Sequence, residues 1–216
     1  MALGTKLSTF FPHPFKLGVM KTIEGYQITF GPITSHLEQK LGPETYAVYL
    51  RLYEEIPTNP KKACRELERL CQEHPDLPEM ANLLSYIYIR LKDLRKAEAL
   101  IQQTYEKHPT YLFARINYAD QCLRKGRTDF AASAFDHTFD LKALYPERKT
   151  FHESEFRGFM VCMGFYHLAV RQTEKARHYY HLAKEIHPDH RSVKALEKKV
   201  FKTSPLKKLA QFFRIP

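Results

Sequence analysis

Apolar residues in the middle of the chain recur three and four residues apart, and short polar breaks separate one such run from the next. This spacing is typical of amphipathic helices. The runs fall in pairs, each joined by a short turn. The expected helices span 44–56 and 59–74, 79–92 and 94–108, 113–126 and 129–145, and 158–170 and 173–187.

Three His-Pro dipeptides follow charged, helix-favouring runs. His74 and His108 lie 34 residues apart, and His187 lies 79 residues after His108. Proline lacks the N–H that a continuing helix needs and disfavours helical geometry at the preceding residue. A histidine in the last turn also suits the negative end of a helix dipole. The dipeptides therefore indicate helix ends rather than a metal site, which would need the three imidazoles to converge.

Small and bulky residues repeat with the same spacing. Ala63, Ala97 and Ala131 are 34 residues apart, Ala176 follows 45 residues later, and a bulky residue stands four positions after each alanine. A period of 34 residues predicts stacked helix–turn–helix units. The third unit contains about eleven extra residues, which we expect to lengthen its second helix and to add a loop near Pro146.

The chain resembles a tetratricopeptide repeat (TPR) array over about two thirds of its length. The second unit matches the family pattern best, and the first departs most, with Arg51 and Glu54 at positions that are usually small and aromatic. The resemblance implies an all-α fold, a right-handed α-solenoid of about four helix–turn–helix repeats with a C-terminal capping helix. The matching residues of the second unit are Leu84, Ser85, Tyr88, Ala97, Ile101 and Pro109.

The chain divides into three predicted parts. Residues 1–43 form an irregular N-terminal arm with a short helix over 35–42. Residues 44–188 form the TPR array, in units 44–77, 78–111, 112–156 and 157–188. Residues 189–216 form a basic capping helix and an amphipathic tail, and Val193, Leu196 and Val200 make the apolar stripe of the cap.

Charge is concentrated at the C-terminal end. The formal net charge is +10, and residues 189–216 carry eight basic and two acidic side chains. The four cysteines have no CxxC spacing, which favours a reducing, cytoplasmic compartment. Residues 1–23 contain three lysines and no acid, but they lack arginine, and Pro12 and Pro14 interrupt any long helix. We therefore do not expect an organelle-targeting peptide.

Enzyme, metal and nucleic-acid functions find little support in the sequence. There is no glycine-rich phosphate loop and no nucleophile in a known motif, so we expect neither catalysis nor a cofactor. His178 and His181 lie three residues apart on one helix but lack further metal ligands. The repeat region is nearly neutral, with no basic stripe that could bind RNA.

The resemblance implies instead a non-catalytic scaffold or adaptor, whose concave groove binds a peptide or a helix of a partner protein. The pattern of the family's two-carboxylate clamp is not met, because Arg90 and Arg124 lie a turn or more beyond the asparagines. Asparagines can hold an extended backbone, and aromatic rings supply apolar contact. The expected groove residues are Tyr49, Leu52, Asn82, Tyr86, Phe113, Asn117, Asp120 and Phe165.

The tail from Ser204 to Pro216 is amphipathic, and three roles for it remain open. It could pack on the capping helix, make weak contact with an anionic membrane, or dock in the groove. A basic-tailed adaptor at membranes or nucleic acid, or a TPR chaperone for secreted substrates, is the alternative function. The tail residues that carry this alternative are Lys207, Lys208, Phe212, Phe213 and Arg214.

Overall fold

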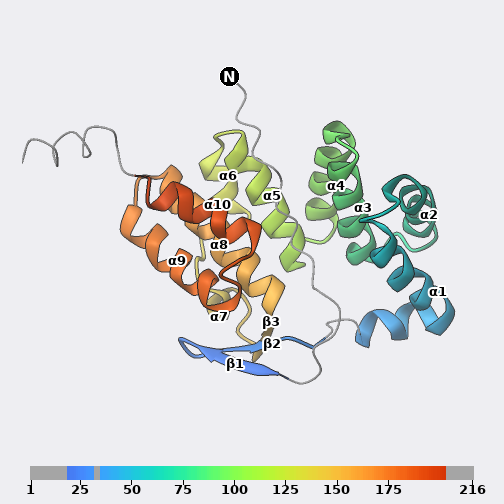
Figure 1. Cartoon of the computed structure of the whole chain (residues 1–216), viewed down its shortest axis with the longest axis horizontal. Helices are drawn as coiled ribbons and strands as arrows, with labels where there is room; N and C mark the ends of the chain where they lie inside the picture. Colours follow the sequence, from blue (N-terminus) through green and yellow to red (C-terminus); the bar gives the residue numbers. More distant parts are fainter. Residues whose placement is uncertain (1–18, 32–34, 203–216) are drawn as a thin grey trace, which may run out of the picture.

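The computed structural model describes residues 19–31 and 35–202, and this part of the chain is mostly helical (Figure 1). The expected all-α class, built from helix pairs, is confirmed. The pairs are α1 (Ser35–Glu55) with α2 (Pro60–Glu73), α3 (Pro78–Arg90) with α4 (Leu94–Lys107), α5 (Leu112–Arg124) with α6 (Thr128–Ser133), and α8 (Glu153–Ala169) with α9 (Thr173–Ile186).

The helix pairs stack side by side. Helix α3 packs against both α2 and α4, α5 packs against α4 and α6, and α8 packs against α9. The repeated alanines lie inside these contacts: Ala63 and Ala176 are 0% exposed, and Ala97 and Ala131 are 1% exposed. A small side chain at this position lets two helices approach closely, so the predicted role of the alanine period is confirmed.

The turns inside the last three pairs share one backbone geometry. Lys92, Gly126 and Arg171 each have a positive φ, of 64°, 72° and 62°. In each turn the next residue donates its N–H to a carbonyl five residues back. This is the Schellman ending of a helix, which places one residue in the left-handed region. The three turn residues are separated by 34 and 45 residues, as the alanines are.

The His-Pro dipeptides end helices, as predicted. His74, His108 and His187 are the C-cap residues of α2, α4 and α9. Each donates its backbone N–H to a carbonyl four residues earlier, and the proline that follows has no N–H to continue the ladder.

The third pair differs from the prediction, because its second helix is shortened rather than lengthened. Helix α6 ends at Ser133, and Asp136 and His137 follow with φ of 51° and 56°, a backbone that stops helix propagation. The carboxylate of Asp136 then pairs with the buried Arg115 of α5, at 2.7 Å. The extra residues form α7 (Leu141–Leu144), capped by Asp140, and a short strand, β3 (Thr150–His152).

The N-terminal arm is not irregular throughout. β1 (Met20–Ile23) and β2 (Tyr26–Thr29) form an antiparallel hairpin, and β2 pairs in parallel with β3. Glu24 and Gly25 both have positive φ, as the central residues of a tight hairpin turn require. The buried Tyr26 and Ile28 alternate with polar residues, a short pattern of period two. The predicted short helix is present as the first part of α1, which is kinked at Gly42.

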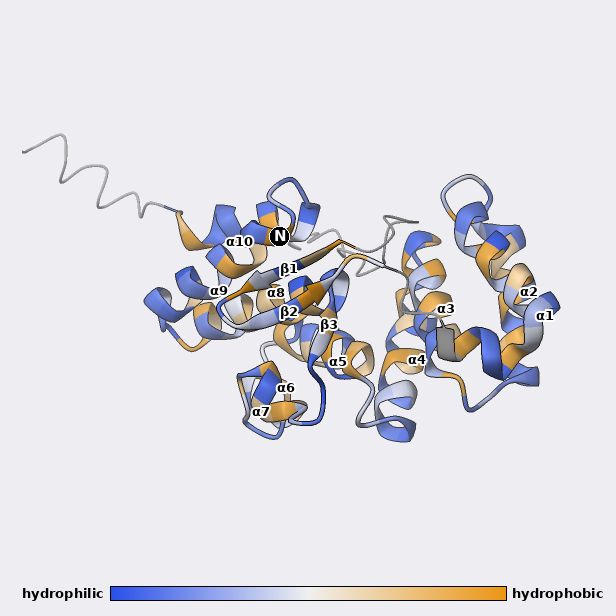
Figure 2. Cartoon of the chain, turned by 90° about the horizontal axis from the view of Figure 1, so that it is seen from below, coloured by the Kyte–Doolittle hydropathy of each residue, from blue (hydrophilic) through white to orange (hydrophobic). Residues whose placement is uncertain are grey.

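The core is divided into two clusters of buried residues. One lies among α1 to α4, and the other joins the sheet to α5, α8, α9 and the capping helix α10 (Arg191–Val200). Figure 2 shows hydrophobic and hydrophilic residues as separate stripes along helices such as α9 and α10. The predicted cap stripe is confirmed, since Val193, Leu196 and Val200 are buried.

Candidate functional site

The first helices of the four pairs contribute to a shared surface, which we call the inner face. The side-chain amides of Asn82 in α3 and Asn117 in α5 are hydrogen-bonded to each other, with Nδ2 of Asn117 donating to Oδ1 of Asn82 at 2.6 Å. Tyr53 of α1 lies within electrostatic reach of Tyr86 in α3 and of Arg157 in α8. We define the inner face by these five residues and their neighbours.

Several of the predicted groove residues belong to the core instead. Leu52 is 0% exposed, and Tyr49 and Phe113 are also buried, so none of them offers a surface to a partner. Tyr49 and Leu52 lie in the core cluster of α1 to α4, and Phe113 lies in the other. The assignment of these three residues to an open groove is therefore corrected, because their helical positions turn toward neighbouring helices.

The asparagine pair has a different role from the one expected. Asn82 is buried, and its side-chain oxygen is already bonded to Asn117. The two amides therefore link α3 to α5 across the boundary between two helix pairs. Each amide keeps unused donor or acceptor capacity, since an amide can form up to four hydrogen bonds.

The remaining predicted groove residues are accessible in part. Asp120 accepts a hydrogen bond from Nε of Arg124 at 3.0 Å, one turn further along α5. Tyr86 and Phe165 are half-buried, and each packs against the core cluster of its own side of the molecule. These side chains, together with Asn117, are the predicted positions that a partner could touch.

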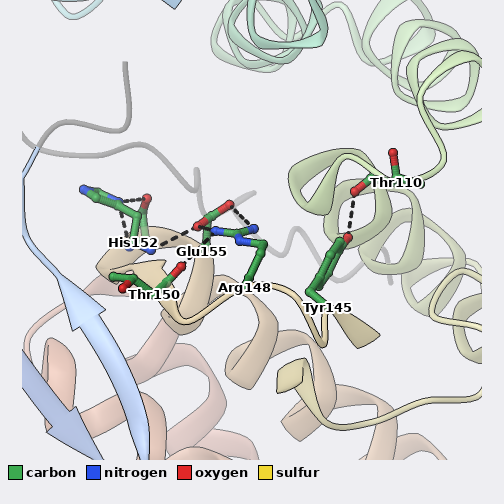
Figure 3. A network of polar contacts seen from close by, with 7 residues as sticks. Thr110, Tyr145, Arg148, Thr150, His152 and Glu155 are labelled. Atoms are coloured by element: carbon green, nitrogen blue, oxygen red, sulfur yellow. Dashed lines mark hydrogen bonds and ion pairs between the residues drawn. The ribbon is translucent and has the colours of Figure 1, made fainter. Parts of the chain in front are cut away.

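A network of polar side chains surrounds the start of α8 (Figure 3). The guanidinium of Arg148 donates to both carboxylate oxygens of Glu155, at 3.1 and 2.6 Å. Glu155 also accepts the backbone N–H of His152, while Nδ1 of His152 accepts the N–H of Ser154. These contacts cap α8, fix the strand before it and leave little freedom to its first turn.

A buried ion pair lies next to this network. Arg157 and Glu153 are one helical turn apart in α8, and Nη1 of Arg157 donates to the Glu153 carboxylate. The same oxygen lies 3.0 Å from Nε2 of His187, at the end of α9. Burial by itself would raise the pKa of Glu153, but the hydrogen bond from His187 and the charge of Arg157 hold it below its usual range. Glu153 is therefore a carboxylate at neutral pH.

Tyrosines from different helices approach this region. Burial raises the pKa of Tyr53, the nearby Tyr86 and Glu153 raise it further, and Arg157 opposes them. Burial likewise raises the pKa of Tyr111, with added contributions from Glu79, Tyr49 and Glu155. Side chains from α1, α3 and α8 thus influence one another although these helices are far apart in the chain.

Sequence reasoning did not identify the polar residues at the start of α8. Glu153 and Glu155 fall at the end of the third predicted unit, 112–156, and Arg157 begins the fourth, 157–188. One signal was available: Glu153 and Arg157 are four residues apart, the spacing of an ion pair on one helix. Their burial was not visible, because it depends on elements that pack over them.

The predicted tail residues Lys207, Lys208, Phe212, Phe213 and Arg214 lie outside the described residues. Within residues 19–31 and 35–202, no three potential ligands are grouped to hold a metal ion. In the same ranges, no helix has the length and apolar character needed to cross a membrane.

No family model and no curated protein matches the chain. Among solved structures, it is similar to one described as "MamA RS-1 ArsTM double mutant", with a TM-score of 0.47 and 14% sequence identity. That similarity covers 80% of this chain and 99% of the other. Neither value is high enough to transfer a function.

Proposed function

We propose that this protein is a non-catalytic adaptor whose inner face binds a peptide or a helix of a partner protein. The observation that carries the proposal is that successive first helices bring aromatic, amide and carboxylate side chains together on one surface. Stacked helix pairs commonly create extended binding surfaces of this kind. The half-buried Tyr86, Asn117, Asp120 and Phe165 are the proposed contact residues.

The buried members of the predicted set support this surface without touching the partner. Tyr49, Leu52 and Phe113 hold the first helices against their neighbours, and Asn82 fixes the amide of Asn117. Rigid support of this kind lowers the entropy lost on binding, because fewer side chains must be ordered.

The test is affinity capture of binding proteins by the full chain and by variants of the contact residues. Asp120→Ala and Phe165→Ala are expected to reduce capture of the partner at least about tenfold, the effect of losing a central contact. Lys61→Ala, an exposed position on the second helix α2, is the matched control and should leave capture unchanged. Circular dichroism should report the same helical content for all three.

Equal capture by the wild-type protein and by both contact variants would show that the partner binds elsewhere. Capture that depends only on residues 203–216 would favour the alternative in which the basic tail makes the contact.

A further inference from the structure

The turns inside the second and third helix pairs lie on one edge of the stack, which we call the turn edge. We define it by residues 90–96, between α3 and α4, and residues 124–130, between α5 and α6. In stacked helix pairs the turns lie on one side, and the connections between pairs lie on the other. Figure 1 shows both turns at the upper ends of these helices. Glu98, one helical turn after Leu94, forms an ion pair with Lys125 at 2.6 Å, so the two turns adjoin.

The basic side chains of these two pairs gather on the turn edge. Residues 90–96 contain four basic side chains and one acidic one, and residues 124–130 contain three and one. At the opposite edge, residues 72–79 contain three acidic side chains and neither lysine nor arginine, and residues 106–112 contain one of each sign. The repeats are therefore nearly neutral as a whole, but their positive charge is concentrated on one edge.

Part of this positive charge is available to an external anion. Lys92, Arg95 and Arg127 are exposed, and none of them forms an ion pair with another residue of the ranges 19–31 and 35–202. Lys125, in contrast, is paired with Glu98. Unpaired charges of one sign on neighbouring turns add to each other and attract anionic groups.

Apolar side chains stand among these charges. Leu94 is 48% exposed and Phe130 is 56% exposed, and in the described part of the chain only five large apolar side chains are exposed in this way. Leu94 is the first residue of α4, and Phe130 lies in the first turn of α6. Both therefore belong to the turn edge. Exposed phenylalanine and leucine beside lysine and arginine are typical of protein surfaces that lie on membranes.

We propose that the turn edge docks on an anionic lipid membrane. Arg95 and Arg127 lie next to lipid phosphate groups, and the side chains of Leu94 and Phe130 enter the headgroup region. Each basic residue close to an anionic bilayer strengthens binding about fivefold. RNA would also attract the arginines, but phosphates offer no apolar surroundings to the leucine and the phenylalanine, so the membrane fits this edge better. The proposal does not depend on the inner face, because none of these four residues is a proposed partner contact.

Co-sedimentation of the full-length protein with lipid vesicles tests the proposal. The protein is expected to bind vesicles of phosphatidylcholine and phosphatidylserine in equal parts, and to bind vesicles of phosphatidylcholine alone only weakly. Arg95→Gln combined with Arg127→Gln should lower the partition coefficient on the anionic vesicles at least about tenfold. No binding to these vesicles, or equal binding by the wild-type protein and the arginine variant, would overturn the proposal and place any contact elsewhere.

A matched control separates the turn edge from net charge. Lys107→Gln combined with Lys149→Gln removes the same charge from exposed positions, with Lys107 at the end of α4 opposite to Leu94. Binding of this variant to the anionic vesicles should be nearly unchanged. A loss as large as that of the arginine variant would show a response to net charge alone and would contradict a specific edge.

The apolar contribution is tested by Leu94→Ser combined with Phe130→Ser. Both side chains are exposed, so helical content measured by circular dichroism should stay the same. Binding to the anionic vesicles should fall at least about tenfold, because the apolar area that enters the membrane is lost. Unchanged binding would overturn the proposal. Tighter binding of the wild-type protein to single-stranded RNA than to vesicles, lost only in the arginine variant, would assign the turn edge to nucleic acid instead.

Discussion

Histidine side chains act at the ends of helices in this protein. Nδ1 of His152 accepts the N–H of Ser154 at the start of α8, and Nδ1 of His190 accepts the N–H of Ser192 at the start of α10. An imidazole nitrogen can accept a hydrogen bond only when it carries no proton. Helix capping by these residues is therefore linked to pH, unlike capping by the amide of Asn59.

We predict that His152→Asn makes stability less dependent on pH. Burial lowers the pKa of His152 below its ordinary value of 6.5, with smaller and opposing effects from nearby charges. As the pH falls through that ordinary value, the unfolded chain takes up a proton before the folded chain does, so stability is lost below it. Asparagine caps equally well without titrating, and loss of a cap costs about 1 kcal/mol.

Urea unfolding at pH 7 and pH 5 measures this effect. The wild-type protein should lose more stability than His152→Asn over that interval. Other histidines whose pKa is lowered by partial or full burial, such as His108 and His167, are present in both proteins and cancel in the comparison. Equal losses would show that the cap does not titrate in this range.

At the scale of elements, the turn between the two helices has the same backbone conformation in each of the last three pairs. The same left-handed position is filled by Lys92, Gly126 and Arg171. Only glycine adopts this backbone without steric cost from a Cβ atom, and no heavy atom would obstruct a Cβ at Gly126. The cost of a side chain at Gly126 would therefore come from the left-handed backbone rather than from packing.

We predict opposite effects for opposite substitutions at this position. Lys92→Gly and Arg171→Gly should each raise the free energy of unfolding by about 0.5 kcal/mol, because they remove a left-handed residue with a side chain. Gly126→Ala should lower it by about 1 kcal/mol for the same reason. Thermal unfolding of the three variants provides the measurement. A loss of stability in both glycine variants would mean that these turns are not strained.

At the scale of the whole molecule, the contact between α4 and α5 joins the second helix pair to the third. The rings of Tyr105 and Tyr118 stack there, with centroids 4.4 Å apart. The Asn82–Asn117 hydrogen bond and the ion pair of Glu98 with Lys125, at 2.6 Å, cross the same boundary. In stacked repeats, stability depends on such contacts between neighbours, so this boundary controls cooperativity.

We predict that Tyr118→Ala uncouples the two sides of the molecule. Loss of the stacked pair and of its burial should cost about 2 kcal/mol and broaden the urea transition. Tyr166→Ala is the control, since Tyr166 stacks on Phe139 away from the α4–α5 contact, with centroids 4.9 Å apart. It should destabilise the protein while keeping the transition sharp. If the free energy of unfolding falls with urea concentration at the same slope in both variants, the α4–α5 contact does not set the cooperativity of unfolding.

The helix pairs, the alanine contacts, the histidine helix ends and the capping stripe could all be predicted from local patterns. Each of these features depends on residues close together in the chain, such as Pro75 at the end of α2 or Ala97 on the buried face of α4. Because the same residue types recur every 34 residues, the same local structure recurs with them. The accessible part of the candidate site, at Tyr86 and Asn117, followed from the same repeat pattern.

Contacts between residues far apart in the chain decided the form of the third unit and the polar contacts at the start of α8. β2 pairs with β3 across more than a hundred residues, and this pairing leaves the extra residues of the third unit in a strand instead of a longer helix. The burial of Arg157, its contact with Glu153 and the approach of His187 depend on how α8, α9 and the hairpin pack together. Side-chain periodicity along one helix shows which face is apolar, but the partner of a polar group on that face is set only when separate elements meet in space.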